Sequence, residues 1–252
     1  MTELVGLATA DWAWVAGSVL VAYAVFGFGG FGAGIVGLPL IAHVMPLREA
    51  VPMTLLLDLV FSGWLGLRHH RLAQHRELLR LAPTLAVGMA LGVVLLARAP
   101  EAWLVGVLGL FVGGYALHSL LSRAVPRPVD TIWALPTGLV GGVFTALYGT
   151  GGPVYTIYLV RRIADKARLR ATTGTLVFAA ALVRLALFTG GGFYAGARLP
   201  LLAATLLPLA TVGYALGSRV HLRLAQDQVR RAIWMLLVAS GASLLLRALA
   251  GA

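Results

Sequence analysis

Two glycine-rich stretches are the parts of this sequence best suited to bind a ligand. The first is Gly27-Phe28-Gly29-Gly30-Phe31-Gly32-Ala33-Gly34-Ile35-Val36-Gly37-Leu38-Pro39, and the second is Tyr148-Gly149-Thr150-Gly151-Gly152-Pro153. Glycine lets a backbone turn sharply and approach a ligand closely, and proline is favoured at the first position of a helix. We therefore predict a broken helix at each stretch, with proline opening a short second helix. The N–H groups at such a helix start bind anions without a basic side chain.

These stretches supply most of the predicted binding site. The candidates are Gly29, Gly30, Gly32, Gly34, Gly37 and Pro39 in the first stretch, and Tyr148, Gly149, Thr150, Gly151, Gly152 and Pro153 in the second. The alternative is that these glycines only permit tight helix packing, as we expect for the small-residue pair Gly88 and Gly92. The matched positions of the two breaks favour binding, because paired discontinuous helices indicate a transporter site.

Two ionisable residues, Asp58 and Arg184, lie inside apolar segments. A charge there costs ~2.5–3.5 kcal/mol on insertion scales, so each is expected to face a cavity or a partner. One interpretation is a direct Asp58–Arg184 pair. A second makes Arg184 an anion ligand or gate and Asp58 the group that couples transport to a proton. A third is structural, with Arg184 extending to the membrane interface.

Threonines near the start of two apolar segments complete the candidate site. Thr54 precedes Asp58 by four residues, and Thr173 lies between Thr172 and Thr175. Their hydroxyls either contact an oxyanion or cap their helices. The chain has no cysteine, which excludes disulfides and thiolate metal sites. We predict no metal and no cofactor.

Composition places the chain in a membrane. Apolar residues make up 60% of it and charged residues only 12%, against about 25% charged in a soluble domain. The net charge of +11 does not indicate nucleic-acid binding, because most basic residues cluster in short loops between apolar segments. That distribution is typical of the positive-inside bias. The expected partners are the lipid bilayer and a small anionic substrate, and the chain is a candidate homodimer.

Ten apolar segments are separated by glycine, proline and charge. They are Trp12–Gly27, Pro39–Met45, Ala50–Leu67, Leu78–Ala97, Ala102–Leu121, Thr131–Tyr148, Pro153–Val160, Ala171–Phe188, Leu199–Gly217 and Arg231–Leu249. This pattern predicts an all-α, polytopic membrane protein with one transmembrane domain over residues 1–252. Segments two and seven would be only about 11–12 Å long as helices, against a hydrocarbon core of ~30 Å.

The two halves, residues 12–121 and 131–249, resemble each other. Gly27, Gly37 and Pro39 correspond to Gly141, Gly151 and Pro153 at an offset of 114, and Met53-Thr54 corresponds to Thr172-Thr173 at an offset of 119. With the basic loops inside the cell, equivalent loops of the two halves lie on opposite sides. The prediction is an inverted 5+5 repeat with both termini outside. Residues 12–45 and 131–160 form broken or re-entrant hairpins whose tips lie at mid-depth.

The chain resembles the sulfite exporter TauE/SafE family of anion transporters. The resemblance lies in Gly27–Pro39 followed by Leu47–Thr54, and again in Gly138–Pro153 followed by Ala167–Thr175. The chain departs from the family pattern at Gly32-Ala33-Gly34, where a glycine triplet is common. It departs again at two looser versions of a Gly-Thr-Ser-like stretch, Val51-Pro52-Met53-Thr54 and Thr172-Thr173-Gly174-Thr175. The resemblance implies a carrier of sulfite, sulfonates or related sulfur or carboxylate anions, with export as a common direction.

The function that these features favour is a carrier of small anions in a bacterial-type inner membrane, working by alternating access with a proton as a candidate coupling ion. An anion channel is the first alternative. An intramembrane enzyme is the second, but the sequence has no H-E-x-x-H or G-x-S-x-G motif and no paired intramembrane carboxylates. We therefore predict that the protein is not an enzyme.

Overall fold

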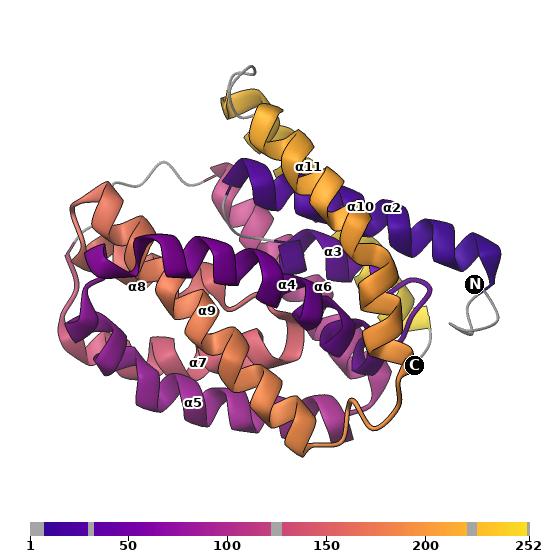
Figure 1. Cartoon of the computed structure of the whole chain (residues 1–252), viewed down its shortest axis with the longest axis horizontal. Coiled ribbons are helices and arrows are strands. Elements are labelled where there is room, and N and C mark those ends of the chain that lie inside the picture. The colour runs from indigo at the N-terminus through magenta and orange to yellow at the C-terminus, as the bar shows by residue number, and fades with distance from the viewer. Residues whose placement is uncertain (1–7, 30–32, 122–127, 221–225, 251–252) are drawn as a thin grey trace. The chain divides into compact units, whose positions relative to one another are not determined.

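The structure is a computed structural model that describes residues 8–29, 33–121, 128–220 and 226–250 (Figure 1). The described residues form helices and connecting turns, with no strand among them. This is the expected outcome for an apolar chain, because in hydrocarbon each backbone N–H and C=O group needs a partner within the protein. The prediction of an all-α, polytopic membrane protein is confirmed.

Among the described residues, six helical stretches are long and apolar enough to cross a membrane. They are Thr9–Phe28, His75–Arg98, Glu101–Leu121, Thr131–Tyr148, Lys166–Gly190 and Arg198–Arg219. The short segments two and seven are also helices, of 9 and 11 residues. At ~1.5 Å per residue, neither is long enough to cross a ~30 Å core alone.

The chain forms two compact units. Unit 1 comprises residues 1–53, 99–123 and 196–252, and unit 2 comprises residues 54–98 and 124–195. Unit 1 contains α2 (Thr9–Gly29), α3 (Ala33–Ile41), α6 (Glu101–Leu121), α10 (Arg198–Val220), α11 (Gln226–Ala250) and the first turns of α4 (Leu47–His69). Unit 2 contains the rest of α4, η1 (His70–Leu72), α5 (His75–Arg98), η2 (Thr131–Trp133), α7 (Ala134–Tyr148), α8 (Gly152–Arg162) and α9 (Lys166–Gly190).

Each unit takes helices from both predicted halves of the chain. The two compact units therefore do not coincide with the two halves of the chain that resemble each other in sequence. The single transmembrane domain and the inverted relation of the two halves stay predictions.

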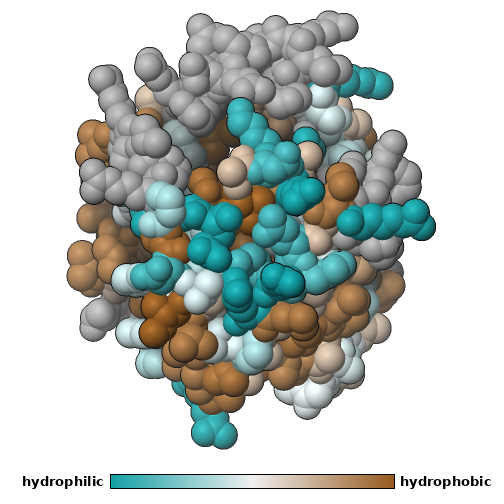
Figure 2. Space-filling view, turned by 90° about the vertical axis from the view of Figure 1, so that its left-hand side faces the viewer, coloured by the Kyte–Doolittle hydropathy of each residue, from teal (hydrophilic) through white to brown (hydrophobic). Residues whose placement is uncertain are grey.

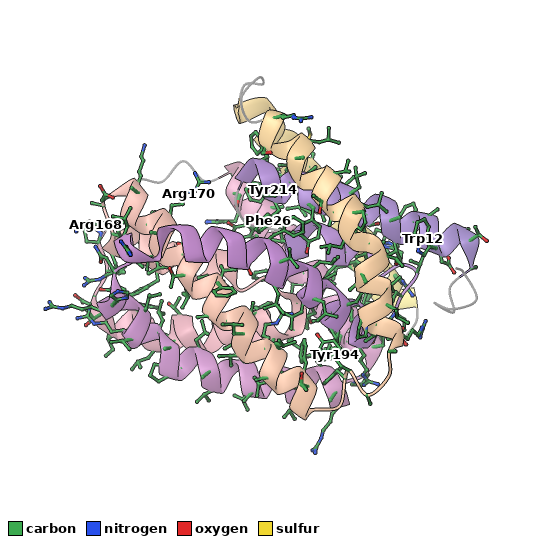
Figure 3. The ribbon with its side chains drawn as sticks, viewed as in Figure 1. Trp12, Phe26, Arg168, Arg170, Tyr194 and Tyr214 are labelled. Atoms are coloured by element: carbon green, nitrogen blue, oxygen red, sulfur yellow. The ribbon has the colours of Figure 1, made fainter. Side chains whose placement is uncertain are left out.

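In unit 1, α10 packs on α2 and α11 packs on α6. Glycines bring the backbones together at the first of these contacts. A Cβ at Gly213 would overlap the carbonyl oxygen of Leu20, and a Cβ at Gly217 would overlap that of Ala24. Figure 3 shows the ring of Phe26 close to that of Tyr214, and their centroids are 6.0 Å apart. Small residues that allow close backbone approach are the usual basis of helix association in membranes.

In unit 2, α5 packs on α7 in the same way. A Cβ at Gly88 would overlap the carbonyl oxygen of Leu139, and a Cβ at Gly92 would lie 2.7 Å from that of Val143. The two packing segments have related sequences. Pro83–Gly92 in α5 and Pro208–Gly217 in α10 share Pro, Val, Gly, Ala, Leu and Gly at the same spacing. The prediction that Gly88 and Gly92 serve packing is confirmed.

The helix boundaries correct the register of the internal resemblance. Helix α2 ends at Gly29 and α7 at Tyr148, α3 begins at Ala33 and α8 at Gly152, and α4 begins at Leu47 and α9 at Lys166. Each pair differs by 119 residues. The offset of 114 that the glycines and prolines indicated is therefore wrong at the breaks. Glycine is so frequent in this chain that a shifted alignment still matches glycine with glycine.

Candidate functional site

The break between α7 and α8 has a local cause in the sequence. Helix α7 ends because Gly149 adopts a left-handed conformation, with φ 64° and ψ 9°. Its N–H donates to the carbonyl oxygen of Thr145 at 2.9 Å, which closes the helix with the common left-handed C-terminal cap. Residues with a Cβ rarely adopt this conformation, so glycine is required here.

Helix α8 begins at Gly152, with Gly151 as its N-cap residue and Pro153 in its first turn. The prediction that Pro153 opens a short helix is confirmed. The N–H groups of Gly151 and Gly152 therefore lie at a helix start, where the helix itself offers them no acceptor. A Cβ at Gly151 would overlap the hydroxyl of Thr145 and the carbonyl oxygen of Gly141. This contact fixes the start of α8 against α7.

Two charged side chains converge on Gly149. A Cβ placed there would lie 3.4 Å from Nη1 of Arg184 and 3.6 Å from Oδ2 of Asp58. Asp58 comes from α4 and Arg184 from α9, so the fold brings a cation and an anion from two helices to the break in a third. The prediction that each intramembrane charge faces a partner or a binding region is consistent with this arrangement.

Arg184 is only 3% exposed. Its guanidinium carbon lies 5.5 Å from the centroid of the Phe188 ring, one turn further along α9. Phe188 in turn packs on Phe193, with 5.0 Å between ring centroids. A cation over an aromatic face is favoured by the ring's electron density. The guanidinium is therefore enclosed by protein within unit 2, and the interpretation that Arg184 extends to the membrane interface stays a prediction.

Tyr194 follows the end of α9 and also lies near Arg184. Burial raises the pKa of Tyr194 to about 12, and the positive charge of Arg184 opposes part of that rise. Figure 3 shows Tyr194 just past the end of α9, at the opposite end from Arg168. Phe188, Phe193 and Tyr194 thus form an aromatic border on one side of the guanidinium.

Hydroxyl groups complete the surroundings of the break. Thr150 is 2% exposed, and its hydroxyl has no hydrogen-bond partner among the described residues. Tyr155, also 2% exposed, interacts electrostatically with Arg184 and with Asp58. Its hydroxyl oxygen lies 3.8 Å from the position of a Cβ at Gly152. A buried hydroxyl without a partner is costly in an apolar interior, so Thr150 marks a place where a polar ligand is favoured.

The structure brings together part of the predicted site. Gly149, Thr150 and Gly151 form a loop that contacts Arg184 and Asp58 at Gly149, and Gly152 and Pro153 form the first turn of α8 directly after it. Tyr148 is fully buried directly before the loop. Thr54 lies one helical turn from Asp58 on the same face of α4. Thr173, however, is three turns from Arg184 along α9, a distance of about 16 Å, and does not belong to the same cluster.

The threonines do not cap their helices. Helix α9 begins at Lys166, and its N-cap is Asp165, whose side chain accepts a hydrogen bond from the N–H of Arg168. Thr54 likewise lies well inside α4. Capping is therefore the wrong interpretation, because both helices begin before the predicted segments, at Leu47 and at Lys166.

The first break differs from its prediction. Pro39 does not open a helix. It lies inside α3, which begins at Ala33, so Gly34 and Gly37 are helical as well. The cause is physical, since these apolar residues are buried and helix formation is the way to satisfy their backbone groups. Gly29 is the last residue of α2, whereas Gly30 and Gly32 lie outside the described residues.

A second polar cluster, at the far end of α8, was missed by the sequence analysis. Glu77 is 4% exposed and accepts hydrogen bonds from the Tyr158 hydroxyl at 2.7 Å, from Arg80 at 2.6 Å and from Arg162 at 3.3 Å. Arg162 also donates to the carbonyl oxygen of Val129 at 3.1 Å. The signal available in the sequence was the spacing of Glu77 and Arg80 in the first turn of a helix. This cluster joins the end of α8 to the start of α5.

Membrane-spanning helices and a helix interrupted beside charges within the membrane segments are together characteristic of secondary transporters. Comparison with known families agrees with this class. Residues 15–244 match the family model of the sulfite exporter TauE/SafE, and the chain belongs to this family. Membership of a transporter family supports the prediction that the protein is not an enzyme.

A curated relative covers much of the chain. The probable inner membrane transporter protein TsaS of Comamonas testosteroni is 30% identical over 199 residues, which are 76% of this chain and 81% of the relative. No solved structure matches the chain.

Proposed function

We propose that this transporter binds a small anion at the break between α7 and α8 and carries it by alternating access. The observation that carries the proposal is the convergence of Arg184 with the N-terminus of α8 at one loop. The guanidinium supplies a fixed positive charge, and the free N–H groups of the first turn supply directional donors. The hydroxyl of Thr150 adds a further donor within the same loop.

The substrate class follows from this chemistry. Several donors around one cation suit a compact oxyanion, in which the charge is spread over oxygen atoms. Sulfite, sulfonates and small carboxylates all have this form. The family description, sulfite exporter, supports a sulfur oxyanion and export as the net direction.

Asp58 is the proposed coupling residue. Its carboxylate lies against the same point as Arg184, so its charge state alters the electrostatic potential at the site. Protonation of Asp58 removes a negative charge and strengthens anion binding, and deprotonation favours release. A proton gradient is then linked to anion movement through one carboxylate.

The proposed orientation puts the loops between α8 and α9 inside the cell and both termini outside, in line with the positive-inside bias. The chain contains no cysteine, so the reaction of a single introduced thiol shows on which side of the membrane that residue lies. Ala164→Cys, between α8 and α9, should react with an impermeant thiol reagent only from the inside, and Gly196→Cys only from the outside. The reverse pattern would contradict the orientation.

The decisive experiment is flux into proteoliposomes that contain the purified protein. Labelled sulfite, a short alkyl sulfonate and a small carboxylate are tested with and without a pH gradient. We expect saturable uptake of at least one sulfur oxyanion and acceleration by unlabelled substrate on the opposite side. A large unitary conductance without counter-transport would instead indicate a channel.

In the same flux assay, the variant Gly152→Leu tests whether the break between α7 and α8 is the binding site. A Cβ at Gly152 meets only the Tyr155 hydroxyl, at 3.8 Å, so the helix start has room for the first carbon of the new side chain. The rest of the leucine fills the space in front of the N–H groups and should abolish transport while insertion continues. Gly114→Leu is the control, because nothing lies within 4 Å of a Cβ there. Normal flux through the Gly152 variant would show that the break is not part of the binding site.

A further inference from the structure

Hydroxyl groups inside the helices of this protein usually bond to their own backbone. Examples are Thr145 to the carbonyl oxygen of Gly141, Thr172 to Arg168, Thr189 to Leu185, Thr211 to Leu207 and Ser18 to Trp14. This is the default for serine and threonine in an apolar environment, because the i−4 carbonyl is the nearest acceptor. A buried helical hydroxyl that departs from this default needs another explanation.

Ser62 in α4 and Thr173 in α9 depart from it. The hydroxyl oxygens of both are buried and have no hydrogen-bond partner in the described part of the chain. Ser62 as a residue is only 3% exposed. Both belong to unit 2, which also holds Asp58 and Arg184.

The two hydroxyls lie on the helix faces that carry the charged residues. Thr54, Asp58 and Ser62 follow one another at intervals of four residues, so they share one face of α4. Thr173 and Arg184 are three turns apart and share one face of α9. Between them on that face are small buried residues, Ala180 and Ala181.

The helices run in opposite directions, which puts both hydroxyls on the same side of the break. The turn after α4 meets the start of α9, where the N–H of Gln74 donates to the Thr172 hydroxyl at 2.9 Å. Ser62 therefore lies between Asp58 and this turn, and Thr173 lies between Arg184 and the same turn. A Cβ at Gly63 would lie 3.2 Å from the Phe178 ring, so the side chain of Phe178 in α9 reaches α4 at this level.

We propose that the anion passes between the break and the start of α9 along the seam of α4 and α9, with the hydroxyls of Ser62 and Thr173 as donors on the way. The inference rests on the proposed function and extends it to a route of about 16 Å, roughly half of the hydrocarbon thickness. Hydroxyls that are not bonded to their own helix are free to exchange between water and an oxyanion.

The route ends at a hydrophilic face. Figure 2 shows hydrophilic side chains gathered, with hydrophobic side chains around them, on the side of the molecule where α8 ends and α9 begins. Exposed residues at these helix ends are Arg161, Asp165, Lys166, Arg168 and Arg170. Arg168 lies at this side in Figure 3. The excess of positive charge attracts an anion to the end of the route.

Thr175 provides a matched control within the same helix. Its hydroxyl also lacks a partner among the described residues. It lies half a turn away from the face of Arg184, on the side that carries the exposed residues Ala179 and Leu182. An unpartnered hydroxyl alone therefore does not define the route, and the comparison of Thr173 with Thr175 isolates the effect of the face.

The first test measures access and needs no transport. Ser62→Cys, Thr173→Cys and Thr175→Cys are made singly in the cysteine-free chain and exposed to a membrane-impermeant, negatively charged thiosulfonate. The two route cysteines should react about tenfold faster or more than Thr175→Cys, because only a hydrated thiol ionises readily. Equal rates at residues 173 and 175 would overturn the proposal, and so would unreactive route cysteines in protein that transports normally.

The second test measures flux. Thr173→Val keeps the side-chain shape and removes the donor, and we expect about a fivefold lower maximal rate, the factor of one hydrogen bond. Thr175→Val should leave the rate unchanged. Unchanged flux in the Thr173 variant would contradict the route. If the unaltered protein carries no anion while the route cysteines still react, the proposed function is wrong. The inference that water reaches the hydroxyls between α4 and α9 is then still supported.

Discussion

The two helix breaks of this protein lie between similar pairs of helices. In each pair, a long helix is followed by a short one that begins four residues after it. At the second break, Asp58 and Arg184 lie against Gly149. When the two halves are aligned with an offset of 119 residues, Asp58 corresponds to Val177 and Arg184 corresponds to Leu65. Each half thus contributes one charge from an equivalent helix, at a position where the other half is apolar.

This difference indicates how the two breaks divide their roles. The residue in the middle of the second break is Thr150, whereas the same register puts Phe31 in the first. We infer that the second break dominates anion binding and that the first has a larger share in packing.

The largest expected effect comes from Arg184. Arg184→Gln removes the buried cation and should lower anion affinity about 10- to 100-fold, in line with the loss of a charged hydrogen bond. Arg184→Lys keeps the charge but loses the planar fork, so its loss should be smaller. Substrate binding by calorimetry or saturation of flux measures both.

The comparison variant in unit 1 is Arg247→Gln, at the end of α3 that lies away from the first break. Arg247 donates to the carbonyl oxygen of Ala42, just after α3. If the second break dominates binding, this change leaves the apparent affinity within about a factor of two, because no charge near the site is lost. A drop as large as that of Arg184→Gln would show that the loss of affinity is not specific to the second break.

The next effect concerns coupling. Asp58→Asn keeps the shape of the side chain and fixes it in a neutral form. Exchange of labelled for unlabelled anion should continue, whereas acceleration by a pH gradient should disappear. The readout is the ratio of flux with and without the gradient, which should fall to about one because no group near Arg184 then titrates. A preserved ratio would assign coupling to another group.

A third comparison tests how much space surrounds one glycine at each short helix, Gly151 before α8 and Gly37 within α3. Gly151→Ala puts a Cβ into the Thr145 hydroxyl and the Gly141 carbonyl oxygen, and should cost about 1–3 kcal/mol of stability. Gly37→Ala puts its Cβ 3.0 Å from that of Ala22, a tight contact but no overlap with backbone. Its helix propensity improves by about 1 kcal/mol, so the loss of stability should be smaller than that of Gly151→Ala. Thermal unfolding in detergent compares the two variants.

Much of the fold was predictable because hydrophobicity marks membrane helices directly. All ten predicted segments overlap helices, and α7 with its preceding turn spans the predicted Thr131–Tyr148. Pro153 was placed correctly because the glycines directly before it, which include Gly149 in a left-handed conformation, end the preceding helix. Pro39 was not, because glycine in a buried apolar segment is compatible with a helix.

The cluster at the second break was only partly predictable. A single intramembrane charge indicates that a partner or a cavity exists, which identified Asp58 and Arg184. Their convergence on Gly149 depends on how α4, α7 and α9 pack, and no spacing within one helix encodes it. Phe188 and Tyr155 were missed as neighbours of Arg184 for the same reason, since aromatic residues are common throughout apolar segments.

The smallest expected effect concerns stability. It compares the contacts that hold the two short helices, α3 and α8, at their ends away from the breaks. Helix α3 is held there by a neutral bond, in which Nε1 of Trp14 donates to the carbonyl oxygen of Leu40 at 2.8 Å. Trp14→Phe should cost about 1 kcal/mol. Helix α8 is held by the buried carboxylate of Glu77, whose partners Arg80 and Arg162 are partly exposed and therefore screened.

Glu77→Gln should therefore cost more than Trp14→Phe, about 1–2 kcal/mol, because the buried end of the network loses its charge while Tyr158 and Arg162 keep their donors. Since α8 begins at the binding loop, the Glu77 variant should also lower the maximal transport rate at nearly unchanged apparent affinity, and Trp14→Phe should change neither. Unfolding and flux measured on the same preparations test this. Equal losses in both variants would mean that the two short helices are anchored alike, and that only the charges at the second break distinguish them.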